Sequence, residues 1–249
     1  MALDLRPAST GQDRPSPAAG VAAAKPIVEI AWSSTIGKKA VMAVTGLLMV
    51  LFLFVHMLGN LKIFFGPNDF NGYAHWLRTI GEPVLHNSWY LWFQRFILVV
   101  AVVLHVTSAA QLSRRDRAAR PIRYQHHPRW QASFATSTMR WGGIIIALFV
   151  IWHVLDLTVG ALNPHFIAGQ PYQNVVADFQ VWWINVIYIA ALVALGFHIN
   201  HGFRSAARTL GIERPDRARA VRFVGTALAL GISLGFIAVP VGVMTGVAH

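Results

Sequence analysis

The chain has 249 residues, 55% hydrophobic and only 12% charged, with 21 Lys and Arg against 10 Asp and Glu and a net charge of +11. A soluble domain usually carries about 25% charged residues, so the composition excludes an ordinary globular protein. The lack of cysteine excludes disulfides and any iron–sulfur cluster held by this chain's own thiolates.

Residues 1–30 are rich in Ala, Pro, Gly and Ser, which predicts a disordered cytoplasmic tail. Residues 31–249 form the predicted membrane domain. It contains five apolar stretches of roughly 20 residues, the length that crosses a hydrocarbon core about 30 Å thick. We therefore expect an all-α integral membrane protein, a bundle of five transmembrane helices at about 40–61, 89–112, 139–162, 179–203 and 221–245.

Lys and Arg gather in alternate connections between these stretches. They precede the first stretch, and they crowd the connections between the second and third and between the fourth and fifth. This positive-inside pattern predicts a cytoplasmic N-terminus and a C-terminus on the outside. The net charge then reflects topology, so no nucleic acid partner is expected. The basic inner face also suits acidic membrane lipid or a soluble protein.

Four of the eleven histidines fall within the apolar stretches, one in each of the first four: His56, His105, His153 and His198. Ionisable groups at this depth usually face the bundle interior with a partner. At 1.5 Å per residue, His56 and His153 lie roughly 25 and 20 Å from the inner edge, and His105 and His198 roughly 13 and 9 Å. The sequence thus predicts an outer pair, His56 and His153, and an inner pair, His105 and His198.

Two imidazoles that face each other across a helix bundle supply both axial ligands of a haem iron. We therefore predict that each pair binds iron in a redox cofactor. Plain hydrogen bonding between helices is one alternative, and a His relay in a proton or metal transporter is another. His201, three residues after His198, is an alternative ligand, a contact for a haem propionate, or an interface residue.

Ordered motifs from residue 30 onward resemble the cytochrome b membrane subunit of succinate dehydrogenase and fumarate reductase, in the branch with a single five-helix, dihaem-type anchor. They include Ser34-Thr35-Ile36-Gly37-Lys38-Lys39, His56-Met57-Leu58-Gly59-Asn60, Asn71-Gly72-Tyr73-Ala74, Phe149-Val150-Ile151-Trp152-His153, Tyr172-Gln173-Asn174-Val175-Val176 and Gly196-Phe197-His198-Ile199-Asn200-His201-Gly202. Their order and spacing together are specific.

The resemblance implies up to two haem b groups on the four histidines. It also implies a flavoprotein subunit and an iron–sulfur subunit on the cytoplasmic face of the plasma (inner) membrane. Electrons from succinate would pass through these subunits and this chain to a quinone, with menaquinone expected, and the chain itself would not bind succinate. The oligomeric state of the complex stays open.

Two alternatives accompany this interpretation. The inner pair can instead hold a Rieske-type [2Fe-2S] cluster whose two cysteines come from the iron–sulfur partner. A dihaem cytochrome b that anchors another quinone-linked dehydrogenase would carry the same histidines.

A quinone site requires an apolar slot, donors for the two carbonyls and a proton route. The outer candidates lie in the first outer connection and one helical turn after the third histidine: Arg78, Glu82, His86 and Asp156. The inner candidates precede the first stretch: Ser33 and Ser34. Ordinary polar loop residues and a helix-end carboxylate are the competing interpretation, and the sequence does not choose between the two levels.

Overall fold

A computed structural model of the protein describes residues 32–119 and 130–248, without the side chains of 130–138. The tail predicted at residues 1–30 lies outside this part. Throughout the described residues the chain is helical, without a strand. The elements in order are α2 (Thr35–Leu61), η1 (Lys62–Phe65), α3 (Pro67–Thr79), α4 (Trp89–Ala118), α5 (Trp130–His153), η2 (Val154–Val159), α6 (Pro171–Phe179), α7 (Trp182–Thr209) and α8 (Ala218–Met244).

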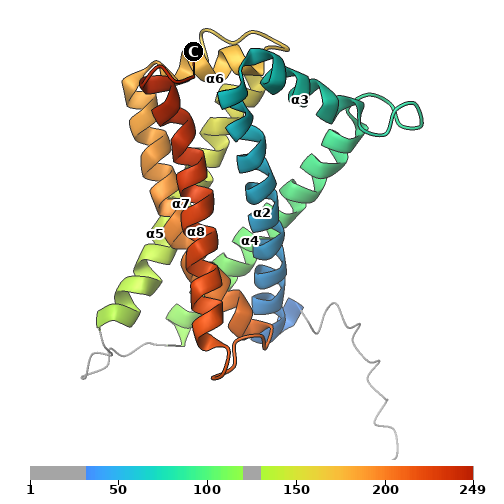
Figure 1. Cartoon of the computed structure of the whole chain (residues 1–249). Coiled ribbons are helices and arrows are strands. Elements are labelled where there is room, and N and C mark those ends of the chain that lie inside the picture. The colour runs from blue at the N-terminus through green and yellow to red at the C-terminus, as the bar shows by residue number, and fades with distance from the viewer. Residues whose placement is uncertain (1–31, 120–129, 249) are drawn as a thin grey trace, which may run out of the picture.

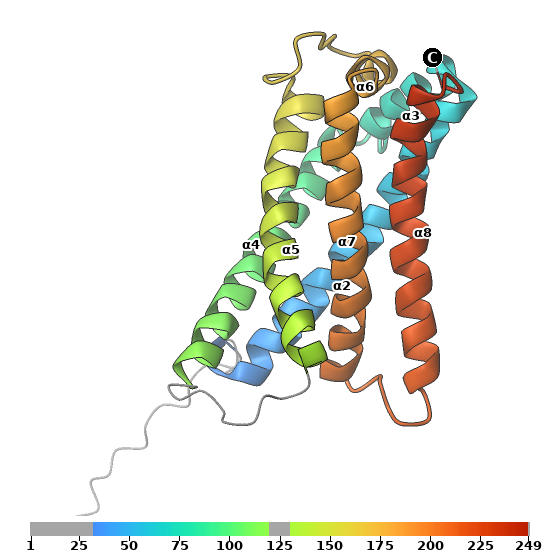
Figure 2. The same cartoon turned by 90° about the vertical axis from the view of Figure 1, so that its left-hand side faces the viewer.

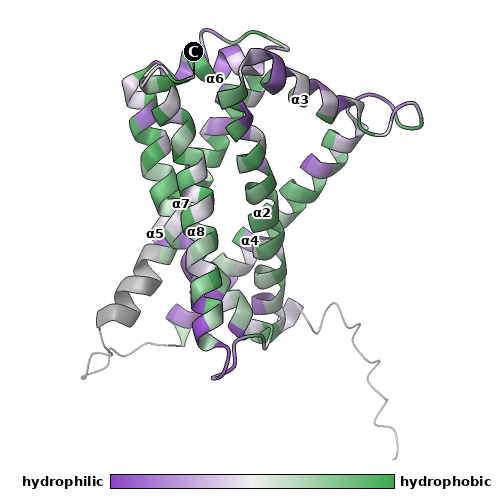
Figure 3. Ribbon diagram, viewed as in Figure 1, coloured by the Kyte–Doolittle hydropathy of each residue, from purple (hydrophilic) through white to green (hydrophobic). Residues whose placement is uncertain are grey.

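Five of these helical segments are long and apolar enough to cross a membrane, which confirms the predicted five-helix membrane fold. They are Thr35–Phe65, Trp89–Ala118, Met139–Val159, Trp182–Thr209 and Ala218–Met244. Large apolar side chains such as Phe96 and Leu148 lie exposed along them, and hydrophobic residues predominate along the middle of the helices (Figure 3). Patches of this extent suit a lipid environment, in which the helices satisfy their own backbone hydrogen bonds.

Local sequence explains where several helices begin. The hydroxyl of Ser34 accepts a hydrogen bond from the Gly37 amide at 2.8 Å, so it caps α2. This cap places the start of the first span five residues earlier than hydrophobicity alone predicts. Pro67 and Pro171 occupy the first turns of α3 and α6, where a missing amide hydrogen costs nothing.

The two ends of the bundle differ in structure and in charge. The short helices α3 and α6 lie across one end, which we call the capped end (Figure 1). The opposite end contains the start of α2 and the Arg-rich ends of α4 and α7, together with the α7–α8 connection, and we call it the basic end. The last described residues lie at the capped end (Figure 1).

Four of the long helices pack in the order α4, α2, α7, α5. α2 packs against α4 and α7, and α5 packs against α7, whereas the described parts of α4 and α5 have no more than marginal contact. In this order α7 stands between α2 and α5, and α2 stands between α4 and α7. α8 packs against α7 and α2, and Figure 2 shows α7 between α5 and α8.

Candidate cofactor site

The four histidines at membrane depth lie in two pairs, each joining two helices that are not direct neighbours in the packing order. The rings of His56 on α2 and His153 on α5 have centroids 6.2 Å apart and planes inclined by 73°. The rings of His105 on α4 and His198 on α7 are also 6.2 Å apart, with planes inclined by 58°. The first pair lies toward the capped end of its helices and the second toward the basic end. All four side chains are half-buried.

The ring spacing is suited to one metal ion between two imidazoles. A metal–imidazole bond is about 2 Å long and the nitrogen lies about 1.1 Å from its ring centre, so two opposed rings on one metal are about 6 Å apart. Among the residues that the structure describes, no three His, Asp, Glu or Cys side chains converge as a metal site. Each pair thus offers two ligands, the number that a haem iron takes from a protein beyond its porphyrin.

Hydrogen bonds orient one ring of each pair. His105 donates from Nδ1 to the carbonyl oxygen of Met42 at 3.1 Å, and the Thr45 hydroxyl lies 3.4 Å from the same nitrogen. His153 Nδ1 is hydrogen-bonded to the Tyr188 hydroxyl at 2.9 Å. In both residues Nδ1 is occupied, so Nε2 is the nitrogen left to bind a metal. A bond on the second ring nitrogen is the usual support of a histidine ligand.

Some buried polar atoms beside the pairs are poorly satisfied. In the described part of the chain, His198 Nδ1 and the hydroxyl of Ser108, one turn after His105, have no hydrogen-bond partner. At the other pair, the Asn60 amide donates to the His56 carbonyl at 2.8 Å and lies 3.4 Å from His56 Nε2, a weak contact. Unsatisfied buried polar atoms are costly, and their presence here fits a site that receives a further polar or metal-bearing group.

Glycines face the pair near the basic end. Gly46 and Gly143 precede His56 and His153 by ten residues each on their helices. A Cβ atom at Gly46 would lie 3.2 Å from Cε1 of His105, and one at Gly143 would lie 3.8 Å from Cε1 of His198. Because Gly46 on α2 and Gly143 on α5 have no side chains, they leave room around the imidazole rings of His105 and His198. A flat ring system bound to these imidazoles requires such room.

A buried acid pair lies at the capped end, beyond His153. Asp156, on the π-helical turn η2, is 2% exposed, and Asp178, on α6, is 4% exposed. Their segments pack against each other, and the two carboxyl groups lie close enough to interact. Burial, reinforced by contact with the Asp156 carboxyl and by its charge, raises the pKa of Asp178 from 3.8 to about 8.

Sequence reasoning singled out Asp156 but missed Asp178 and Tyr188. Asp178 precedes the fourth span directly and resembles a routine helix-end carboxylate. One signal was available: the segment from residue 156 to 181 contains two Asp and no Lys or Arg. Two acids without a nearby cation predict mutual contact or exposure, and the structure shows contact.

The remaining candidates for a quinone site do not gather around Asp156. Arg78, at the end of α3, donates to the Ala74 carbonyl at 2.6 Å, and Glu82 accepts from the Asn87 amide at 3.1 Å. Arg78 thus lies at the end of α3, and Glu82 and the exposed His86 lie in the connection to α4, away from α6 (Figure 1).

The two serines lie at the basic end. Ser34 caps α2, and the Ser33 carbonyl accepts from Arg115 of α4 at 3.0 Å. The structure therefore places the quinone candidates in three separate groups.

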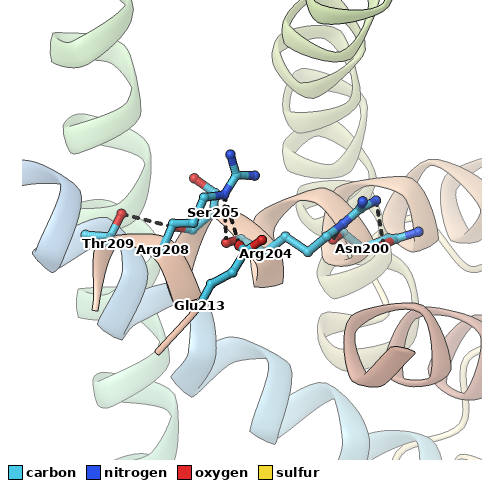
Figure 4. A network of polar contacts seen from close by, with 6 residues as sticks. All are labelled: Asn200, Arg204, Ser205, Arg208, Thr209 and Glu213. Carbon is cyan, nitrogen blue, oxygen red and sulfur yellow. Dashed lines mark hydrogen bonds and ion pairs between the residues drawn. The ribbon is translucent and has the colours of Figure 1, made fainter. Parts of the chain in front are cut away.

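His201 is half-buried on α7, one turn nearer the basic end than His198. It follows Asn200, the first residue of a polar network at the end of the helix that Figure 4 shows. There Arg204 donates to the Asn200 side chain at 3.0 Å, and Arg208 pairs with Glu213 at 3.1 Å. Because His198 is the ring that faces His105, the geometry favours His198 as the ligand and leaves His201 beside these cations.

Comparison with known protein families found a match over part of the chain. The family described as succinate dehydrogenase/fumarate reductase transmembrane subunit matches residues 111–239, which is just over half of the chain and includes His153 and His198. No curated protein and no solved structure matches the chain.

Proposed function

The chain belongs to the succinate dehydrogenase/fumarate reductase transmembrane subunit family, and from this premise we propose that it carries electrons between an iron–sulfur partner and a membrane quinone through two bis-His haems. As a member, it is a multi-pass membrane subunit of an oxidoreductase complex. The observation that carries the proposal is the common ring spacing of 6.2 Å in two pairs at different depths.

In this proposal, His105 and His198 hold the haem near the basic end, and His56 and His153 hold the haem near the capped end. Each haem, when bound, supplies an iron that accepts and returns one electron. The protein contributes the imidazoles, the bonds from Met42 and Tyr188 that fix two of them, and the room left by Gly46 and Gly143. Neither pair touches succinate, which the chain does not bind.

The positive-inside rule assigns the basic end to the cytoplasm. The flavoprotein and iron–sulfur subunits dock there, at the plasma membrane, where the family resides. Electrons then reach His105 and His198 first and the capped-end pair second. The two levels thus form a path across the membrane.

For the quinone we propose the capped end, with menaquinone as the substrate. Quinone reduction consumes protons as well as electrons, and buried carboxyl groups lie there beside the second histidine pair. Arg78, Glu82 and His86 remain candidates for the rim of this site. Ser33 and Ser34 are the candidates for a site at the basic end, where Ser34 is already engaged as a helix cap.

The test is a reduced-minus-oxidised absorption spectrum of the purified complex, with iron and acid-labile sulfide measured per chain. We expect b-type haem bands at about two haems per chain, together with a copurifying flavoprotein. Iron and sulfide without a second haem would assign a shared Rieske-type cluster to the inner pair. Haem in a complex with a different soluble dehydrogenase would identify another quinone-linked complex. A protein without iron would mean that the histidines only pack between helices or form a relay in a transporter.

A further inference from the structure

The acid pair at the capped end has an unusual hydrogen-bond balance. Asp156 and Asp178 lie against each other, and the Oδ2 atom of each is buried with no hydrogen-bond partner among the described residues. Two ionised carboxylates can only accept hydrogen bonds and repel each other at close range. A proton on one carboxyl removes this repulsion and lets that carboxyl donate a hydrogen bond to the other.

The surroundings do not supply a positive charge in place of that proton. Among the described ion pairs, none involves Asp156 or Asp178. The neutral amide of Asn163 points to Oδ1 of Asp178 at 3.4 Å. The titratable groups on the neighbouring helices are Tyr188 of α7, which is buried, and His153 of α5. Neither forms an ion pair with the two acids among the described residues, so a shared proton is the remaining way to satisfy the pair.

The position of the pair connects a histidine site with the capped-end surface. Asp156 lies on a single π-helical turn that follows His153 directly, and such turns occur often at functional sites. Asp178 belongs to α6, the helix that covers this end (Figure 1). Asn163, a buried residue of the connection between them, contacts Asp178. The pair thus lies between this connection at the capped end and the histidine pair.

We propose that Asp156 and Asp178 form a proton-exchange site that holds one proton between them and passes it to a quinone reduced at the capped end. This inference rests on the proposed function for its electrons. Reduction of the quinone to quinol takes two electrons, which arrive through the histidine pairs, and two protons. The pair acts once for each of these two protons. It releases its proton to a quinone oxygen and becomes doubly ionised, and it then takes a new proton from the capped-end surface.

Infrared difference spectroscopy of the purified complex tests the shared proton. Wild-type protein should show a carbonyl-stretch band of a protonated carboxylic acid that shifts in deuterium oxide. Both Asp156→Asn and Asp178→Asn should abolish this band, because the proton belongs to the pair. Asp69→Asn removes an exposed carboxylate of α3 paired with Lys62 at 3.9 Å, and this control should retain it. A band that is absent from wild type, or that survives both pair substitutions, would overturn the proposal.

A kinetic measurement on the same samples tests the role in quinone reduction. Asp156→Asn and Asp178→Asn should each slow succinate-driven quinone reduction at least tenfold, while succinate still reduces the haems at the wild-type rate. Asp178→Glu should recover part of the rate, which a general loss of folding would not allow. Unchanged quinone reduction in both Asn variants contradicts the proposal. A carboxyl band in a protein without haem would instead refute the proposed function and leave the proton site standing.

Discussion

His153 and Tyr188 are joined by a 2.9 Å hydrogen bond between the imidazole Nδ1 and the phenol hydroxyl. The Tyr188 ring is itself fixed by edge-to-face contacts, with centroids 5.0 Å from Phe149, 5.4 Å from Trp152 and 4.7 Å from Phe179. An aromatic cluster thus holds the hydroxyl that orients one histidine. The corresponding bond of His105 is made by a backbone carbonyl, so the two pairs differ in what supports them.

Replacement of Tyr188 by Phe removes only the hydroxyl from this arrangement. The buried Nδ1 of His153 then lacks its partner, which costs about 1–3 kcal/mol, and the imidazole becomes a weaker donor to its metal. We expect the midpoint potential of the capped-end haem to change while that of the basic-end haem stays constant. Redox titration followed by absorption resolves the two. Tyr90→Phe, on the exposed side of α4, is the control, and equal shifts of both potentials in Tyr188→Phe would contradict the assignment.

The pairing of His56 with His153 and of His105 with His198 predicts that single histidine substitutions act on one site at a time. His105→Ala and His198→Ala should each lose the basic-end haem, and His56→Ala and His153→Ala the capped-end haem, because one imidazole does not replace two. Haem content per chain and the redox difference spectrum measure the loss. If any single substitution removed both haems from a protein that is still folded, the two sites would not be independent.

Gly46 offers a test that leaves every histidine in place. A Cβ atom there would lie 3.2 Å from His105 Cε1, tighter than ordinary van der Waals contact, so Gly46→Ala should displace the ring and weaken binding of the basic-end haem. Gly231→Ala on α8 is the matched control, since nothing lies within 4 Å of its added Cβ. Alanine favours either helix by about 1 kcal/mol over glycine. If both variants lost haem equally, the contact with His105 would not be the cause of the loss.

The sequence predicts the membrane fold well because lipid imposes strong rules on it. Span length and the spacing of the histidines along rigid helices follow from the helical rise alone, and this suffices to bring His105 opposite His198. The acid pair follows no such rule. Asp178 reaches Asp156 only because α6 folds back over the capped end, a tertiary feature without a periodic pattern. Arg78, Glu82 and His86 appear close together in sequence, yet the outward course of α3 carries them away from Asp156.

The raised pKa of Asp178 links the acid pair to the pH dependence of stability. The folded protein keeps a proton on this carboxyl up to a pKa of about 8, whereas the unfolded chain releases it near the ordinary value of 3.8. Between these values the folded state binds more protons, so the free energy of unfolding falls as the pH rises. The contribution is complete below pH 3.8 and is lost as the pH passes 8. Its slope is at most about 1.4 kcal/mol per pH unit.

Asp178→Asn removes this titration while it keeps the size of the side chain. Thermal unfolding of the detergent-purified complex from pH 5 to pH 9 should show wild type losing stability relative to the variant as the pH rises, with the difference levelling off above pH 8. Since other groups titrate in both proteins, the difference between the two curves is the informative quantity. Asp69→Asn should run parallel to wild type. Parallel curves for Asp178→Asn would mean that Asp178 is ionised in the folded protein, because a carboxylate with an ordinary pKa contributes no slope in this range.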